Sequence, residues 1–348
     1  MNLKGKKILL LMPQFFNYST LLINELERRG AVVEFVENKI QRFDPASPQC
    51  KMRFLRQIYY DLFSLRWRYL KKLIYTKVSY DIFLCINGFS FDGKLVQKLR
   101  ETNPDIHCVL YLWDSTKMYD WGGITSYFDK SFSFDPLDAQ QLGISYLANF
   151  YPRDVELTNA ILTKDIFFIG SQHADRFDVL KKIVTHIKAV SDYEIHLLIK
   201  YRNILHHEIV YYFLKKSKSN FAINFVKNYE LVENKISEDF LIYSPISPEI
   251  SRIMMEHSRC VLDIQAPNQV GLPHQLILAL GMGKKIITTN NWIVNFDFYN
   301  PKQILIINRD NPIISHDFLK ADLVVTEFSN SIKNSKIDNW VDMIFFKI

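Results

Sequence analysis

Short apolar runs alternate along the chain with segments whose apolar residues recur at helical spacing. Runs typical of buried strands lie at residues 6–12, 31–37, 80–88 and 107–114. Helical spacing marks residues 18–29 and 93–104, and Gly30 follows the first of these helices as a stop signal. This strand–helix–strand order predicts a parallel sheet with helices on its faces.

The same alternation begins again in the second half of the chain. Further strands are predicted at residues 165–171, 194–200, 240–247, 260–265 and 284–290, and helices at 174–190, 206–216, 248–258 and 272–283. Between the halves, residues 148–154 carry Pro152 and charged residues without an apolar period. We therefore predict an α/β protein with two Rossmann-like domains, at 1–155 and 156–330, followed by a final helix within 331–348.

Composition narrows the class of protein. With 48% hydrophobic and 23% charged residues, the chain is globular rather than disordered, collagenous or coiled-coil. The net charge of +6 permits an anionic partner, but no dense basic stripe of the kind found in nucleic-acid binders accompanies it. Cys85 and Cys108 lie in apolar runs and are expected to be buried thiols, because no pair of cysteines has zinc-binding spacing.

The segment 51–78 is unusually rich in basic and aromatic residues. Residues 51–78 interleave Lys and Arg with large apolar and aromatic residues, and Asp61 is their one acidic neighbour. Such a helix can rest on an anionic membrane surface, or it can cover the sheet with its basic face in solvent. The apolar start of the chain reads as a first strand rather than a signal peptide, and no apolar run reaches the length of about 18 residues needed to span a bilayer. We expect a cytoplasmic protein, in contact at most with the inner face of the membrane.

Several common catalytic motifs are missing from the sequence. It contains no GxGxxG after the first strand, no phosphate-binding GxxxxGK[ST], no GxSxG and no HExxH. The run His206-His207-Glu208 is better explained as a solvated helix face, since adjacent helical residues point in different directions. Simple dehydrogenases, P-loop enzymes, lipases and zinc proteases are disfavoured.

The first candidate site follows the strand at 107–114. Trp113-Asp114-Ser115-Thr116-Lys117 places a carboxylate beside an aromatic ring at a strand's carboxyl end. Asp114 there can act as a base or orient a hydroxyl group. The alternative is that Asp114 or Ser115 caps a helix.

The second candidate site is the turn Gly170-Ser171-Gln172-His173-Ala174-Asp175-Arg176. It joins a strand to a helix, whose N-terminus offers free N–H groups to an anion, and Arg176 can add charge-assisted bonds to a phosphate. In the alternative interpretation the turn is ordinary and Arg176 pairs with Asp175 or Asp178.

The third candidate site is the polar loop from Asp263 to Pro273, which leads into an apolar helix. Gly271 can let a ligand approach the backbone closely, and Pro273 suits the first turn of a helix. The helix ends at Leu280-Gly281, which is C-cap chemistry.

Six segments together resemble a family of bacterial GT-B glycosyltransferases found among capsule and lipopolysaccharide biosynthesis proteins. They are YDIFLCINGFSF, LYLWDSTK, YFDKSFSFDPLDAQQLGISYLANFY, FFIGSQHADRFDVLKKI, SRCVLDIQAPNQVGLPHQL and ALGMGKKIITTN, in this order over residues 80–292. The resemblance implies two Rossmann-like domains facing a cleft, with a nucleotide sugar on the C-terminal domain and an acceptor glycan, free or lipid-linked, on the N-terminal one. It implies no cofactor and no metal, and a final helix that crosses back to the N-terminal domain.

The resemblance also assigns roles to residues. Asp114 becomes the candidate catalytic base or acceptor-orienting group. Donor contacts are expected from Gly170, Ser171, His173, Arg176, Gln269, Gly271, Leu272 and Gln275. The expected function is transfer of a sugar from a nucleotide donor to a cell-surface glycan precursor.

The chain departs from the family at two positions. Where the family has an Arg and then a Glu, this sequence has Gln275 and Leu278. A similar Glu holds the nucleotide ribose in many GT-B enzymes, and leucine cannot accept that hydrogen bond. Loss of such a bond weakens binding by about 1.5–3 kcal/mol. The alternative function is therefore a non-catalytic GT-B scaffold that partners an active transferase.

Overall fold

The structure is a computed structural model of the chain. It describes residues 2–38, 79–87, 93–117, 121, 123–157, 159–189, 191–199, 211, 212, 214–216, 220–233, 238–267, 269–322 and 328–346. The basic aromatic segment 51–78 and most of the predicted helix 206–216 lie outside the described residues, as does Cys50.

The chain divides into two compact units. The first consists of Met1–Asp154, Gln269–Ile277 and Lys333–Ile348, and the second of Val155–Asn268 and Leu278–Ile332. The predicted ranges placed residues 269–277 in the C-terminal domain, whereas the structure places this segment in the first unit. The physical reason is a set of hydrogen bonds to first-unit residues, described below with the site.

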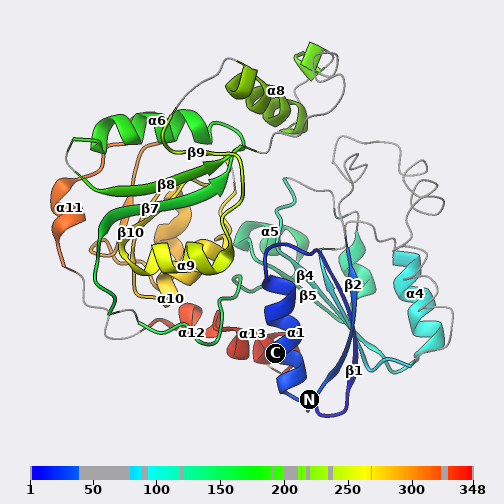
Figure 1. The fold of residues 1–348 in the computed structure, drawn as a ribbon. Helices are drawn as coiled ribbons and strands as arrows, with labels where there is room; N and C mark the ends of the chain where they lie inside the picture. Colours follow the sequence, from blue (N-terminus) through cyan, green and yellow to red (C-terminus); the bar gives the residue numbers. More distant parts are fainter. Residues whose placement is uncertain are drawn as a thin grey trace. The chain divides into compact units, whose positions relative to one another are not determined.

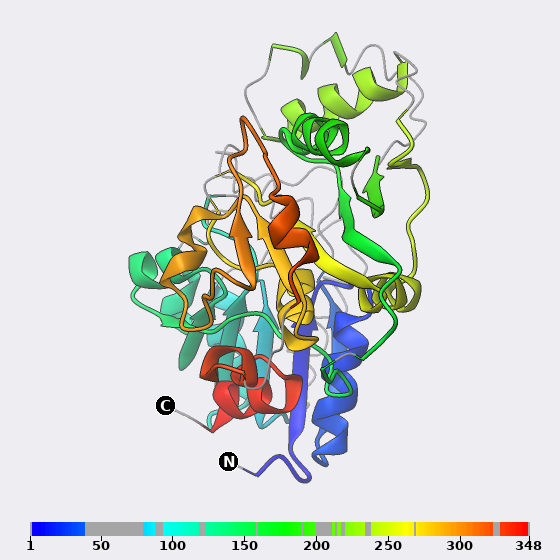
Figure 2. The same cartoon turned by 90° about the vertical axis from the view of Figure 1, so that its left-hand side faces the viewer.

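The first unit contains a six-stranded sheet in the order β2-β1-β3-β4-β5-β6, with all neighbouring strands parallel. Its strands are β1 (Lys7–Met12), β2 (Val32–Glu37), β3 (Ile82–Ile86), β4 (His107–Leu112), β5 (Lys130–Ser133) and β6 (Ser145–Tyr146). Its helices are α1 (Tyr18–Arg28), α4 (Gly93–Thr102), the 3₁₀ helix η1 (Ile124–Tyr127), α5 (Pro136–Leu142) and α13 (Ile337–Phe345). The β1–α1–β2 unit at the start of the chain is drawn in blue in Figures 1 and 2.

Both faces of this sheet are buried. From β1, Leu9 and Leu11 point into one apolar cluster, which α4 covers, while Ile8 and Leu10 point into the other. Helices α1 and α13 cover this second face (Figure 1). Alternate side chains of a strand point to opposite faces, so a sheet covered on both sides reads as a continuous apolar run, and this explains KILLLM.

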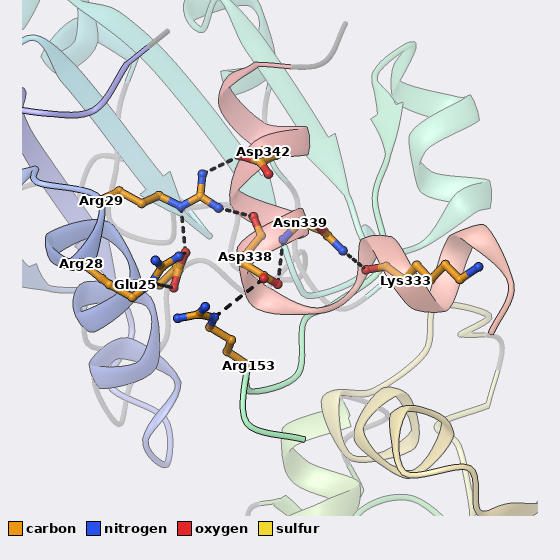
Figure 3. A network of polar contacts seen from close by, with 8 residues as sticks. All are labelled: Glu25, Arg28, Arg29, Arg153, Lys333, Asp338, Asn339 and Asp342. Atoms are coloured by element: carbon orange, nitrogen blue, oxygen red, sulfur yellow. Dashed lines mark hydrogen bonds and ion pairs between the residues drawn. The ribbon is translucent and has the colours of Figure 1, made fainter. Parts of the chain in front are cut away.

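The end of the chain is anchored on the first unit. The Trp340 side chain is fully buried, and its indole N–H donates to the carbonyl of Ala148 at 3.0 Å. Figure 3 shows polar contacts on the same helix. Arg29, the residue directly after α1, donates from its guanidinium group to the Asp342 carboxylate at 2.5 Å and to the carbonyl of Asp338. Helix α13 is therefore held by both apolar packing and ion pairing.

The second unit contains another six-stranded parallel sheet, in the order β12-β11-β10-β7-β8-β9. Its strands are β7 (Lys164–Ser171), β8 (Tyr193–Leu198), β9 (Leu241–Ile242), β10 (Ser258–Asp263), β11 (Lys285–Thr288) and β12 (Ile304–Ile306). Its helices are α6 (Arg176–Ile187), α8 (Asn220–Glu233), α9 (Pro248–Glu256), η2 (Asn291–Asn295) and α11 (His316–Lys320), while α10 (His274–Gly281) and α12 (Asn330–Asn334) span the divisions between the units. The predicted α/β class with two Rossmann-like sheets is confirmed.

Two smaller expectations also have an outcome. Cys85 and Cys108 are buried free thiols, as predicted, and burial raises the pKa of Cys108 to about 12. Within the ranges that the structure describes, no helix is both long enough and apolar enough to cross a membrane.

Candidate functional site

In the first unit, polar side chains gather where β3 and β4 end. Asn87 follows β3, and its side-chain oxygen accepts from the N–H of Trp113 at 2.8 Å. Its amide nitrogen donates to the Asp114 carboxylate at 2.5 Å. Because parallel strands end at the same edge of a sheet, Asn87 and Asp114 meet there although 27 residues separate them.

The environment of Asp114 changes its acidity. Burial raises the pKa of Asp114 to about 6, and hydrogen bonds from Asn87 and Trp113 limit that rise. Asp114 taken as a whole residue has intermediate exposure. A carboxylate with a pKa near 6 is a better proton acceptor at neutral pH than an ordinary aspartate, which suits the predicted role.

Asp114 does not cap a helix within the residues that the structure describes. Ser115 Oγ accepts from the N–H of Lys117 at 3.2 Å, and residues 116 and 117 form a turn. Thr116 is held by the carboxylate of Asp138, which accepts hydrogen bonds from the N–H and the hydroxyl of Thr116. The chain after β4 is thus fixed on both sides of Asp114.

An aromatic cluster lies next to this carboxylate. The His274 imidazole stacks on Tyr18 with ring centroids 3.9 Å apart, and Trp113 meets the same imidazole edge-on at 5.5 Å. Phe15 and Phe16, just before Tyr18, are 48% and 54% exposed. The exposed rings of Phe15 and Phe16 are thus linked through Tyr18 to Trp113, the chain neighbour of Asp114.

The contacts of His274 define its protonation state. Its Nδ1 lies 2.9 Å from the carbonyl oxygen of Phe150, which can only accept, so Nδ1 carries the proton. Burial lowers the pKa of His274 to about 4, and the imidazole is neutral at pH 7. Its Nε2 is buried and has no hydrogen-bond partner among the described residues.

The loop before α10 is docked on the first unit by a carboxylate. Asp135 Oδ2 accepts from the N–H groups of Val270 and Gly271 at 3.0 and 2.9 Å. The carbonyl of Leu272 accepts from the Asn149 side chain at 2.9 Å. In the loop where donor contacts from Gln269, Gly271 and Leu272 were expected, the N–H groups of Val270 and Gly271 are therefore engaged by Asp135.

In the second unit, Arg176 stands where β7 and β10 end. Its guanidinium donates to the carbonyl of Ile264 at 3.1 and 2.6 Å and to that of Ser171 at 2.7 Å. A Cβ at Gly170 would lie 3.0 Å from Nη1 of Arg176, so the glycine makes room for this side chain. The alternative interpretation pairs Arg176 with Asp175 or Asp178, whereas the hydrogen bonds of its guanidinium are to the carbonyl oxygens of Ile264 and Ser171.

A second guanidinium lies at the same edge. Arg309 contacts the Asp175 carboxylate, the carbonyl of Gln265 and the hydroxyl of Thr289. Burial lowers the pKa of Arg176 to about 10; Asp263 raises it and the positive charge of Arg309 lowers it further. Two cations thus lie close enough to repel, and Asp175, whose side chain is 40% exposed, is the carboxylate paired with Arg309.

No group of His, Cys, Asp and Glu side chains able to hold a metal ion occurs among the described residues. The polar groups at the two sheet edges are instead guanidinium groups in the second unit and a carboxylate with amides in the first. These are ligands for an anion and for hydroxyl groups, respectively.

Comparisons with known proteins now bear on the fold. No family model matches the sequence, and no curated protein sequence does either. Among solved structures, the chain resembles an apo lipopolysaccharide outer core galactosyltransferase with a TM-score of 0.50 and 14% identity, over 98% of this chain and 100% of that one. It also resembles sucrose-phosphate synthase from Thermosynechococcus elongatus, with a TM-score of 0.54 and 12% identity, over 87% and 86%.

A third similar structure is an alpha-glucosyltransferase in complex with UDP and DNA. Its TM-score is 0.50 at 14% identity, over 88% of this chain and 87% of that one. The chain has the GT-B fold. The resemblance that the six sequence segments carried is therefore confirmed at the level of the fold, with both six-stranded sheets included.

The predicted site residues of this GT-B protein fall into two groups. Gly170, Ser171, His173 and Arg176 lie in the second unit, whereas Gln269, Gly271, Leu272 and Gln275 lie in the first together with Asp114. Leu272 is buried, and the Gln275 side-chain nitrogen is buried without a partner among the described residues.

Sequence reasoning missed three residues of these sites. Asn87, His274 and Arg309 each act through partners far along the chain: Asp114, Phe150 and Asp175. The one local signal was for Asn87, a polar residue that directly follows the apolar strand β3, much as Asp114 comes two residues after β4. His274 and Arg309 have no such signal.

Proposed function

We propose that this protein is a glycosyltransferase that moves a sugar from a nucleotide donor to an acceptor glycan. The second unit holds the donor diphosphate at Arg176 and Arg309, and the first unit holds the acceptor beside Asp114. The observation that carries the proposal is the pair of guanidinium groups at the carboxyl edge of the second sheet, in a chain with the GT-B fold.

The chemistry required is charge stabilisation and orientation of a hydroxyl group. When the glycosidic bond to the nucleotide breaks, negative charge grows on the diphosphate, and two nearby cations stabilise it. Arg176 is pre-oriented by its carbonyl partners, so little side-chain freedom is lost on binding. Asp114 accepts a hydrogen bond from the attacking acceptor hydroxyl, and we propose that no metal takes part.

The acceptor proposed from the sequence is a cell-surface glycan precursor, met at the inner face of the membrane. Support for this finer statement is the resemblance to capsule and lipopolysaccharide enzymes and the basic segment 51–78. An anionic lipid-linked acceptor suits such a segment. Nucleic acid is not proposed as a partner.

Binding of nucleotides is the direct test. Thermal unfolding is followed with UDP, GDP, CMP and their sugars, each in the presence of EDTA. A ligand at 100 times its dissociation constant raises the free energy of unfolding by about 2.7 kcal/mol. We expect one nucleotide class to shift the melting temperature, and Arg309→Gln to abolish that shift.

The matched control is Arg252→Gln. Arg252 also lies in the second unit and pairs with a carboxylate, Glu256 at 3.0 Å, but on helix α9 away from the sheet edge. It is expected to leave the nucleotide shift intact. A shift that appears only after magnesium is added contradicts metal independence, and equal loss in both variants contradicts the assignment of the donor edge.

The alternative, a non-catalytic scaffold, is favoured by Gln275 and Leu278. In this case no nucleotide shifts the melting temperature of the wild-type protein. The double variant Gln275→Arg, Leu278→Glu then separates two explanations: restored nucleotide binding indicates a donor site lost through these residues, and continued absence indicates that the donor edge is not a nucleotide site.

A further inference from the structure

The residue after β3 has an uncommon backbone conformation. Asn87 has a φ of +50°, in the left-handed region, and its side chain is 0% exposed. Asparagine tolerates this region better than most residues other than glycine, but the conformation still persists only where the surroundings fix it. The contacts of Asn87 must therefore hold its backbone in this conformation.

Four hydrogen bonds fix Asn87. Its N–H donates to the carbonyl of Tyr111 at 2.9 Å, and its own carbonyl accepts from the Asn38 side chain at 2.6 Å. Its side-chain oxygen accepts from the Trp113 N–H at 2.8 Å, and its side-chain nitrogen donates to Asp114 Oδ2 at 2.5 Å. The oxygen and the nitrogen of the amide thus bind the backbone of Trp113 and the carboxyl group of Asp114, respectively.

We infer that Asn87 is a positioning residue for Asp114, which holds its carboxyl group at the edge of the first sheet and favours its ionised form there. An amide nitrogen can only donate, so the bond to Oδ2 is strongest when Asp114 is a carboxylate. The role of Asp114 toward an acceptor hydroxyl rests on the proposed function. The effect of Asn87 on Asp114 does not, and it can be measured without an activity assay.

Among the residues that the structure describes, few other groups act on this carboxyl. Burial and the hydrogen bonds from Asn87 and Trp113 are what shift the pKa of Asp114. Two titratable side chains contact the flanking residues: Asp138 binds Thr116, and neutral His274 touches the Trp113 ring. Lys117 is the nearest cationic residue along the chain. Loss of the Asn87 amide therefore removes one of the two interactions that oppose burial.

The test is a titration of Asp114 by the ¹³C resonance of its carboxyl group in protein labelled at aspartate, with the resonance assigned through Asp114→Asn. In Asn87→Gly the backbone keeps its left-handed conformation and loses only the side chain. We expect the pKa of Asp114 to rise by about one unit, so that the ionised fraction at pH 7 falls from about nine-tenths to about one-half. Asn87→Asp, with a like charge in place of the amide, raises it further.

The matched control is Asn38→Ala. It removes the hydrogen bond to the carbonyl of Asn87 at the same buried place but touches neither end of the amide. It is expected to lower the melting temperature and leave the Asp114 titration unchanged. If Asn87→Gly lowers the melting temperature as Asn38→Ala does and leaves the titration of Asp114 unmoved, Asn87 is only structural and the inference is overturned.

Once a donor and an acceptor are known, enzyme kinetics add a second readout. In Asn87→Gly the acid limb of kcat/KM moves to higher pH, kcat falls at pH 6, and the KM of the donor stays as in the wild type. An absence of any transferase activity contradicts the proposed function, but the carboxyl titration still decides the role of Asn87.

Discussion

The carboxylate of Asp135 binds the backbone N–H of Gly271 at 2.9 Å, across 136 positions of sequence. The other oxygen of the same carboxylate caps helix α5 through the N–H groups of Leu137 and Asp138. One side chain thus fixes both the start of a helix and the loop that precedes α10. This relation explains why residues 269–277 belong to the first unit.

Gly271 is required for that docking. A Cβ built on it would lie 2.6 Å from the Phe134 ring, and Phe134 is almost fully buried. We predict that Gly271→Ala lowers the free energy of unfolding by about 1–3 kcal/mol, because the ring cannot move aside without disturbing the core. Urea unfolding measures this, and Val270→Ala, a truncation in the same loop, is the control with the smaller expected loss. Equal losses in both variants contradict the clash.

The fold was largely predictable because each central strand is buried on both faces and therefore shows as an apolar run. The pattern fails for β6 and β12, which are two and three residues long and too short to show a period. Asp114 and Arg176 were predictable because they come within a few residues of the ends of the apolar strands β4 and β7. Arg309 was not, because its partners Asp175 and Gln265 come close only when the sheet edge assembles.

Arg29 and Arg28 provide a matched pair for testing how the end of the chain is held (Figure 3). Both bind Glu25, but Arg29 is mostly buried and also reaches Asp342 at 2.5 Å, whereas the Arg28 side chain is 45% exposed. We predict that Arg29→Ala lowers the free energy of unfolding by about 2–4 kcal/mol, since it leaves Glu25 and Asp342 with fewer partners. Arg28→Ala is expected to cost about 0.5 kcal/mol.

Hydrogen exchange locates the effect of Arg29. In Arg29→Ala the amides of α13 are expected to exchange faster, while those of the second unit stay as in the wild type. Uniform acceleration throughout the chain, or equal losses for the two arginines, contradicts a specific anchor of α13.

His274 should make the protein sensitive to acid. Its pKa is lowered from 6.5 to about 4, so between these values the unfolded chain binds a proton that the folded chain does not. The free energy of unfolding therefore falls as the pH drops through this window, by about 3 kcal/mol in all. Urea unfolding at pH 7.5, 5.5 and 4.5 measures the slope, and His274→Gln is expected to flatten it.

The control for this pH dependence is His316→Gln, at an exposed position on α11. It should retain the wild-type slope. A wild-type slope in His274→Gln instead shows that other groups produce the acid sensitivity. The ¹⁵N shifts of the imidazole give an independent check, because the contact with Phe150 requires the proton on Nδ1.

Asp114 makes the free energy of unfolding depend on pH in the opposite direction. Its folded pKa of about 6 lies above the ordinary 3.8, so between these values the folded carboxyl keeps a proton that the unfolded one has released. The free energy of unfolding falls as the pH rises through this window, and above pH 6 the ionised carboxylate destabilises the fold. Asp114→Asn keeps an oxygen to accept from Asn87 and carries no charge. We predict that it stabilises the protein at pH 8 by about 1–2 kcal/mol and has little effect at pH 4.

The same substitution separates stability from function. If Asp114 receives the acceptor hydroxyl, Asp114→Asn lowers kcat by about 10²–10⁴ while nucleotide binding is unchanged. Asp105→Asn, at an exposed position in the first unit, is the control for loss of a negative charge and should change neither quantity. If Asp114→Asn is more stable at pH 8 and still fully active, the Asp114 carboxylate lowers the stability of the fold without contributing to turnover. Asp114 is then not the group that binds the acceptor hydroxyl.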